Sequence, residues 1–208
     1  MKQLWYNKNM PRTGLNPSEI KEKAIDLTIA SMRKSGFEKV RLVDIAKELG
    51  VSHAALYAHF KDKSALLDAV SERWLMQIDK DLEAVCKKSK DPCEKILQWV
   101  LTLHHAKVQK VSNDPELYKA FNLSTASEKP FTNRHLEIMH AQLTGLVREA
   151  IAKKRLRNAD PEVMASIIRE STMSFHHPRL VAQYLGEKRE PLLRQVLESV
   201  LKGLKLKS

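Results

Sequence analysis

Four prolines in this chain directly follow an asparagine or an aspartate, and a glutamate follows each pair within one helical turn. The pairs are Asn16-Pro17, Asp91-Pro92, Asp114-Pro115 and Asp160-Pro161, with Glu19, Glu94, Glu116 and Glu162 behind them. The Asn or Asp side chain can accept a hydrogen bond from a free backbone N–H group, and proline at the first helical position breaks no intrahelical bond. The pattern therefore predicts α-helices that begin near residues 17, 92, 115 and 161.

Apolar residues between these starts recur every three or four positions, which is the spacing of one helix face. One such stripe is Leu67, Val70, Trp74, Ile78 and Leu82. Another is expected to run from Met164 to Phe175 along a single helix. No segment of useful length alternates with a period of two, so we predict an all-α fold of about nine helices. Gly36, Gly50 and Gly186 are expected to end helices.

The composition excludes several classes of protein. No run in the 208 residues approaches the roughly 18 apolar residues of a membrane span. Residues 1–13 are polar, so we expect no signal peptide, and two cysteines cannot form a disulfide framework, which favours the cytoplasm. The net charge of +11 favours a polyanionic partner, nucleic acid before an acidic membrane surface.

The order of predicted helices indicates two domains. Three short helices, at about 17–35, 42–49 and 53–59, precede residue 64, and longer helices follow it. We therefore predict a head of residues 14–63 and a body of residues 64–208, with a long helix from about 62 to 88 between them.

The segment from Val43 to Phe60 has the pattern of a helix-turn-helix. Ile45, Ala46 and Leu49 give a first short helix its buried face, and Gly50 can adopt a left-handed turn. Ser52 can cap a second helix, whose buried side would carry Leu56. In such motifs the second helix lies in the major groove of DNA.

The segment Ile45-Ala-x-x-Leu-Gly-Val-Ser-x-x-x-Leu-Tyr-x-His-Phe-Lys-x-Lys63, followed by Ala65-Leu-Leu, resembles the signature of the TetR (tetracycline-repressor) family of bacterial regulators. The resemblance covers about residues 17–70, and the rest of the chain is similar only in length and helical character. It implies a ligand-responsive repressor that binds a near-palindromic operator as a homodimer and is released by a small effector. We expect no enzymatic activity, no cofactor and no membrane partner.

Carried over position by position, the resemblance assigns two groups of DNA contacts. Side chains at the start of the recognition helix meet base edges, and later donors bind phosphates. The first group is Ser52, His53, Ala54 and Ala55, and the second is Tyr57, His59, Lys61 and Lys63.

The chain departs from the family pattern at two positions. Arg41 stands where the family often has threonine; it can contact phosphate but is a poor helix cap. Val43 stands where a polar or basic residue is frequent, which removes one base contact. We therefore expect DNA shape or apolar contacts with thymine methyl groups to contribute to recognition.

The resemblance also implies an effector cavity and a dimer seam in the body. Bulky residues are the candidates for the cavity: Trp74, Trp99, Tyr118, Phe121, Met139, His140, Leu143, Met173 and Phe175. Candidates for the seam lie in residues 161–204, with Phe175 also considered: Ile167, Ser171, Leu193, Val196, Leu197 and Val200. For any single residue in either group, ordinary core packing is the alternative interpretation.

Other chemistries remain as alternatives. Cys86 and Cys93 flank a lysine-rich turn and are candidates for a thiol switch, and the pairs His104-His105 and His176-His177, with His135 and His140, are candidates for a metal site. The alternative functions are thus a thiol- or metal-sensing regulator of the same fold, or a DNA-binding module without an effector. No glycine-rich phosphate loop, nucleophile elbow or HExxH motif is present, so no catalytic residue is assigned.

Overall fold

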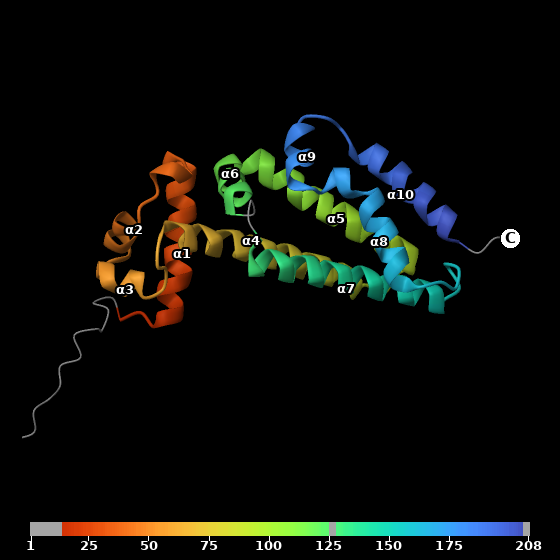
Figure 1. The fold of residues 1–208 in the computed structure, drawn as a ribbon, viewed down its shortest axis with the longest axis horizontal. Coiled ribbons are helices and arrows are strands. Elements are labelled where there is room, and N and C mark those ends of the chain that lie inside the picture. Colours follow the sequence, from red (N-terminus) through yellow and green to blue (C-terminus); the bar gives the residue numbers. More distant parts are fainter. Residues whose placement is uncertain (1–13, 125–127, 206–208) are drawn as a thin grey trace, which may run out of the picture. The chain divides into compact units, whose positions relative to one another are not determined.

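The computed structural model describes residues 14–124 and 128–205, and these residues form α-helices and 3₁₀ helices without a strand (Figure 1). The α-helices are α1 (Pro17–Ser35), α2 (Leu42–Leu49), α3 (His53–Tyr57), α4 (Lys63–Cys86), α5 (Pro92–Asn113), α6 (Pro115–Ser124), α7 (Pro130–Ala152), α8 (Pro161–Ser171), α9 (Pro178–Gln183) and α10 (Glu190–Leu204). The 3₁₀ helices are η1 (Phe37–Lys39) and η2 (Met173–Phe175). The all-α prediction is confirmed. The expected absence of a signal peptide concerns residues 1–13, which lie outside the described residues.

The helices begin where the proline pattern predicts. The Asn16 side chain accepts from the Glu19 N–H group at 3.0 Å, and the Glu19 carboxylate accepts from the Asn16 N–H group at 2.8 Å. Asp91 and Asp160 likewise accept from N–H groups in the first turns of α5 and α8. These bonds use donors that a helix start leaves free, so the local sequence alone determines these starts.

The described chain divides into two compact units. Residues 14–72 together with 116–124 form the first unit, and residues 73–115 together with 128–205 form the second. This division differs from the predicted boundary at residues 63 and 64 in two ways: the first turns of α4 and nearly all of α6 belong to the first unit. The long helix α4 therefore contributes residues to both units.

The core of the first unit joins α1, α2, α3, the start of α4 and α6. Met32, Leu56 and Leu66 have no exposed surface in this core, and Leu117 and Ala120 of α6 are buried in it. Apolar side chains gain free energy by leaving water. Because α6 supplies part of that buried surface, it is a structural member of the head.

Gly36 is required where α1 ends beside α6. Its φ of 87° is unfavourable for other residues, and a Cβ there would lie 3.2 Å from a carboxylate oxygen of Glu116. The same Glu116 oxygen accepts a hydrogen bond from the Phe37 N–H group at 3.1 Å. The hydrogen bond from Lys119 lowers the pKa of Glu116 the most, and the bond from Phe37 lowers it further. The small glycine thus permits a direct link between η1 and α6.

The second unit is built around α5, which packs against α7, α9 and α10, while α8 packs against both α7 and α10. Its buried residues include Leu75, Ile96, Leu143, Ile168 and Leu193. No helix of the described chain combines the length and the apolar composition that crossing a membrane requires.

The prediction of one continuous helix from Met164 to Phe175 is wrong. Helix α8 ends at Ser171, and Phe175 lies in η2. The side-chain oxygens of Ser171 and Thr172 donate back to the carbonyl groups of Ile167 and Ile168, a local bond that competes with helix continuation. Phe175 is nevertheless buried, so the apolar spacing identified a core residue but not the helix end.

Candidate functional site

The first candidate site is built on the turn between α2 and α3. Helix α2 begins after Arg41, whose side chain makes no capping bond, as expected. Gly50 ends α2 in the left-handed conformation with φ 72°, and Ser52 accepts from the Ala55 N–H group at 3.1 Å to start α3. The buried face of α2 and the buried Leu56 of α3 hold the two helices together. This is the helix-turn-helix geometry that the sequence predicts.

Helix α3 presents its other face to solvent. Ser52, His53 and Ala54 are exposed, Ala55 is partly buried, and Tyr57 retains 42% of its surface. The rings of His53 and Tyr57 lie 4.3 Å apart between centroids. An exposed helix start with small and hydrogen-bonding side chains can approach base edges and phosphates.

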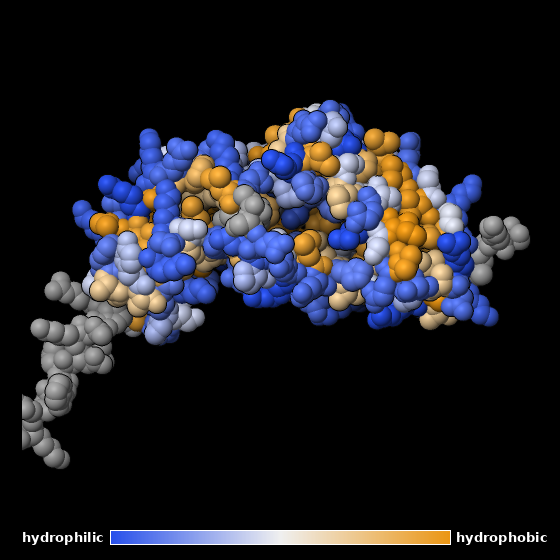
Figure 2. Space-filling model, in the orientation of Figure 1, coloured by the Kyte–Doolittle hydropathy of each residue, from blue (hydrophilic) through white to orange (hydrophobic). Residues whose placement is uncertain are grey.

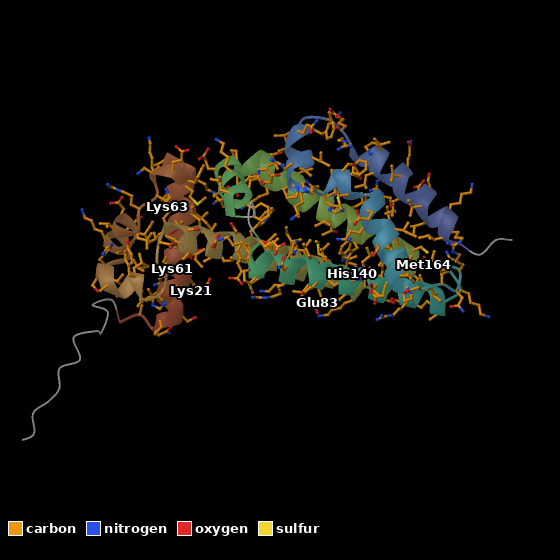
Figure 3. All side chains as sticks on the ribbon, viewed as in Figure 1. Lys21, Lys61, Lys63, Glu83, His140 and Met164 are labelled. Carbon is orange, nitrogen blue, oxygen red and sulfur yellow. The ribbon has the colours of Figure 1, made fainter. Side chains whose placement is uncertain are left out.

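The basic residues around α3 differ in their exposure and in the hydrogen bonds that their side chains make. Lys61 is exposed and His59 partly so, whereas the Lys63 ammonium donates to the Glu38 carbonyl oxygen at 2.5 Å (both lysines are labelled in Figure 3). To bind a phosphate, Lys63 must therefore exchange a bond within the head.

Arg41 also makes bonds within the protein when no DNA is bound. Its guanidinium makes two bonds to the Asp44 carboxylate, at 2.7 Å and 3.2 Å, and Asp44 raises the pKa of Arg41. Val43, between them, is 55% exposed and presents an apolar side chain on the outer face of α2. This arrangement agrees with the expectation that Val43 supplies no polar base contact.

A second, separate candidate site is a group of polar side chains inside the second unit. Lys107 of α5 is 4% exposed, and its Nζ lies 4.7 Å from the ring centroid of Trp74 in α4. Burial lowers the pKa of Lys107 to about 8, an effect that nearby Asp79 partly opposes. A buried ammonium is uncommon in a protein core.

His135 of α7 joins this group. Its Nδ1 lies 2.5 Å from Oδ1 of Asp79, while its Nε2 is buried without a hydrogen-bond partner among the described residues. Burial lowers the pKa of His135 despite the bond to Asp79, and Lys107 lowers it further. Gln142 donates to the Asp79 carbonyl oxygen and accepts from the Trp99 indole.

Lys107 and Asp79 were not predicted as site residues from the sequence, and His135 was placed only in a possible metal cluster. A signal for Lys107 was available: it falls on the apolar face of α5, three residues after His104 and four before Val111. A charged residue in an apolar stripe is a candidate for function, because burying it without a use is costly.

The structure distributes the predicted cavity residues differently from the expectation. Trp99, Met139, Leu143 and Phe175 are buried in the second unit, where Met173 and Trp74 are half-buried. Tyr118 and Phe121 are buried on α6 and belong to the first unit. A cavity of about 30 Å³ beside Phe175 and His104 has room for water but not for an effector.

His140 is not placed in an interior cavity. Its Nε2 lies 2.7 Å from the Glu162 carboxylate, and the two side chains are 37% and 47% exposed (Figure 3 labels His140). Residues 139 and 140 are neighbours on α7 but point in different directions, because each helical residue rotates the face by about 100°. Met139 is therefore buried and His140 lies at the surface.

The predicted dimer residues also separate into two groups. Leu193 and Leu197 have no exposed surface and pack in the protomer core, and the dimer seam itself stays a prediction. Ile167 is 40% exposed, and Ser171, Val196 and Val200 are exposed or partly exposed. The apolar stripe predicted the helix correctly, but it did not predict which side of the helix faces the interior of the protomer.

The alternative sensing sites gain no support. Burial raises the pKa of both the Cys86 and the Cys93 thiols, which reduces the reactive thiolate. Within residues 14–124 and 128–205, no three potential ligands of the His, Cys, Asp or Glu type come together to hold a metal.

Comparisons with known proteins agree with this geometry. The family model "Bacterial regulatory proteins, tetR family" matches residues 24–70, and the model "Tetracyclin repressor-like, C-terminal domain" matches residues 92–197. A stretch of 87 residues is 33% identical to the HTH-type transcriptional regulator BetI of Brucella suis, and covers 42% of this chain and 43% of BetI. The matched part thus spans less than half the length of this curated relative.

Two solved structures share the fold. SmeT, the repressor of the Stenotrophomonas maltophilia multidrug efflux pump SmeDEF, has a TM-score of 0.62 at 20% identity, with 92% of this chain and 91% of SmeT covered. FadR from Bacillus subtilis in complex with stearoyl-CoA has a TM-score of 0.61 at 18% identity, with 88% and 98% covered. At these identities the likeness concerns the fold alone.

The exposed α3 on a buried α1–α2 support, followed by a separate helical unit, defines a helix-turn-helix regulator of transcription. The chain belongs to the tetR family of bacterial regulatory proteins, which is not a family of enzymes.

Proposed function

We propose that this regulator is a repressor that binds a near-palindromic operator as a homodimer and leaves it when a small molecule binds the second unit. It acts in the cytoplasm, where bacterial DNA lies. The observation that carries the proposal is the exposed face of α3, which presents His53, Ala54 and Tyr57, while the opposite face of the helix packs in the core of the head. A short helix held in this way supplies base and phosphate contacts in the major groove.

A surface on α8 and α10 supports the homodimer. Val163 and Ile167 are exposed one turn apart on α8, and Leu192 is exposed on α10 beside the partly exposed Val196 and Val200. Figure 2 shows this apolar area over the two helices, which pack against each other. Contiguous exposed apolar surface is a frequent sign of an interface, and a two-fold dimer matches a palindromic operator.

Two helices can transmit ligand binding to the head. Helix α4 begins at Lys63 in the first unit and continues through Trp74 in the second, and α6 is joined to η1 by the bond between Glu116 and Phe37. A ligand changes DNA affinity only if it binds one arrangement of these elements more tightly than the other. Typical coupling of about 1–3 kcal/mol would change operator affinity about 5- to 150-fold.

The operator can be identified by selecting bound duplexes from random DNA with the full-length protein. The proposal predicts a near-palindromic sequence and an affinity that falls with salt, with a log–log slope of about −0.9 for each phosphate contacted. Selection of a sequence with no two-fold symmetry would contradict the homodimer. A salt-independent affinity would contradict the phosphate contacts.

A thermal-shift screen with a metabolite panel tests the regulatory part separately. A ligand that binds the folded protein raises the melting temperature, and the same ligand should then reduce operator affinity. A ligand that stabilises the protein without changing operator affinity would leave a DNA-binding module without an effector.

A further inference from the structure

We propose that the effector carries a single carboxylate, which binds between the Lys107 ammonium and Nε2 of His135, with Trp74 as an aromatic wall. The inference rests on the proposed function, because it names the chemistry of the ligand that such a regulator requires. Three helices, α4, α5 and α7, supply these residues within one unit.

Lys107 provides the positive charge. Its ammonium lies 4.7 Å from the Trp74 ring centroid, and the side chain is almost entirely buried. Desolvation disfavours the charge and lowers the pKa of Lys107 to about 8, so most of the lysine is still protonated at neutral pH. A carboxylate brought into this interior would stabilise that charge much more than it could in water.

His135 provides a nitrogen that the protein itself does not use. Its Nδ1–H group is directed to the Asp79 carboxylate, so the neutral ring presents a lone pair at Nε2, which is buried without a partner in the described chain. A second carboxylate beside the ring favours its protonated form, which can donate from Nε2. Binding is therefore coupled to uptake of a proton from solvent by His135.

Charge balance supports one negative charge on the ligand. Before binding, the ammonium of Lys107 and the carboxylate of Asp79 have opposite charges, and His135 is neutral. After binding, two cations face two anions, whereas a phosphate dianion would leave an excess negative charge in the interior. Charged and titratable groups near this pair include Lys110, Asp114, Arg169, His176 and His177. Lys110 and Asp114 form an ion pair at 3.4 Å.

The surroundings favour a ligand with an apolar or aromatic part. Met139 and Leu143 follow His135 at four-residue spacing on one face of α7, and both are buried. Trp74 is only half-buried, so part of this residue is accessible from solvent. An acid with a short apolar tail fits a polar anchor in such an environment.

The test is calorimetry on the full-length protein without DNA, with octanoate and 4-phenylbutyrate as probes and their primary amides as neutral matches. We expect each carboxylate to bind at least tenfold more tightly than its amide. Titrations at pH 7.0 in two buffers of different ionisation enthalpy should show net uptake of protons. Lys107→Met and His135→Gln should each weaken carboxylate binding at least tenfold, and His135→Gln should also abolish most of the proton uptake.

Lys80→Met is the matched control, because Lys80 is exposed on α4, and it should bind like wild type. Lys107→Met replaces the ammonium with an apolar end of similar length, and its melting temperature without ligand is measured beside that of wild type so that lost binding is distinguished from unfolding. Equal binding of amides and carboxylates, no binding by either carboxylate, or normal binding by Lys107→Met would overturn the inference. Operator affinity, measured in parallel, tests the proposed function independently. If the wild-type protein binds no operator, the proposed function is contradicted whatever the calorimetry shows.

Discussion

The rings of His53 and Tyr57 lie 4.3 Å apart between centroids and are tilted by 57°, one helical turn apart on the exposed face of α3. Each ring limits the motion of the other. A restrained side chain loses less conformational entropy when it binds, so this contact prepares both residues for DNA. His53 is the first residue of α3 and Tyr57 is the last, so the pair spans the recognition helix.

Tyr57→Phe should weaken operator binding about tenfold, because it removes a hydroxyl donor to a charged phosphate but keeps the ring contact with His53. Tyr57→Ala should weaken it further, since His53 also loses its neighbour. Fluorescence anisotropy with labelled operator measures both. Tyr184→Phe, outside the head, is the matched control, and equal affinities for Tyr57→Phe and wild type would exclude a phosphate contact by the hydroxyl.

Asp44→Asn should strengthen operator binding several-fold. The change releases Arg41 from its two bonds to Asp44 and makes the guanidinium available to phosphate. Glu48→Gln removes the same charge from the exposed side of α2 and controls for the general increase in positive charge. Arg41 has no specific role if both variants gain affinity equally. The same conclusion follows if adding Arg41→Ala to the Asp44→Asn variant does not remove the gain in operator affinity.

Ile167→Glu should dissociate the proposed homodimer without unfolding the protomer, because it places a charge in the exposed apolar surface of α8 and α10. Sedimentation should show monomers at micromolar concentration and a normal helical spectrum. Met76→Glu, at an exposed apolar position of α4, should sediment like wild type. By contrast, Leu197→Ala should reduce the free energy of unfolding by about 2–5 kcal/mol, because Leu197 is core. A dimeric Ile167→Glu variant would contradict this interface.

Acidification from pH 7 to pH 5 should destabilise the fold. Burial lowers the pKa of His104, His135 and His176, that of His176 to about 4 from an ordinary 6.5, with Lys107, His177 and Arg169 adding to its decrease. Between about pH 6.5 and pH 4 the unfolded chain therefore binds protons that the folded chain does not. The free energy of unfolding falls as the pH falls, by about 1–2 kcal/mol at pH 5 for His176 alone.

Urea unfolding at pH 7 and pH 5 measures this effect. His176→Gln should make the free energy of unfolding less dependent on pH across that range. Parallel behaviour of the variant and wild type would show that His176 does not titrate with the lowered pKa.

Features determined by local sequence were predictable. The Asn16 capping box, the Pro92 and Pro161 helix starts and the left-handed Gly50 turn depend on residues within a few positions of one another, and all are confirmed. The helix-turn-helix followed for the same reason, because its turn and caps are encoded within one continuous segment.

Features that depend on which helix faces which were not predictable. The stripe on α10 gave an apolar face, but only the fold shows that Leu197 packs inside the protomer while Leu192 remains exposed. The pairing of His135 with Asp79 joins residues 56 positions apart, and no spacing rule connects them. The place of α6 in the head depends likewise on contacts distant in sequence, those of the buried Leu117 and Ala120 and the bond between Glu116 and Phe37.

The most direct test of the account is the operator affinity of Ala54→Glu, compared with Ala30→Glu by fluorescence anisotropy. Ala54 is exposed near the start of α3, where an acidic side chain favours the helix but repels DNA, and Ala30 is exposed on α1 of the same head. Both variants should keep the wild-type melting temperature. The account predicts that Ala54→Glu loses at least a hundredfold in operator affinity and that Ala30→Glu remains close to wild type. Normal binding by Ala54→Glu would contradict the assignment of α3 as the DNA-recognition helix.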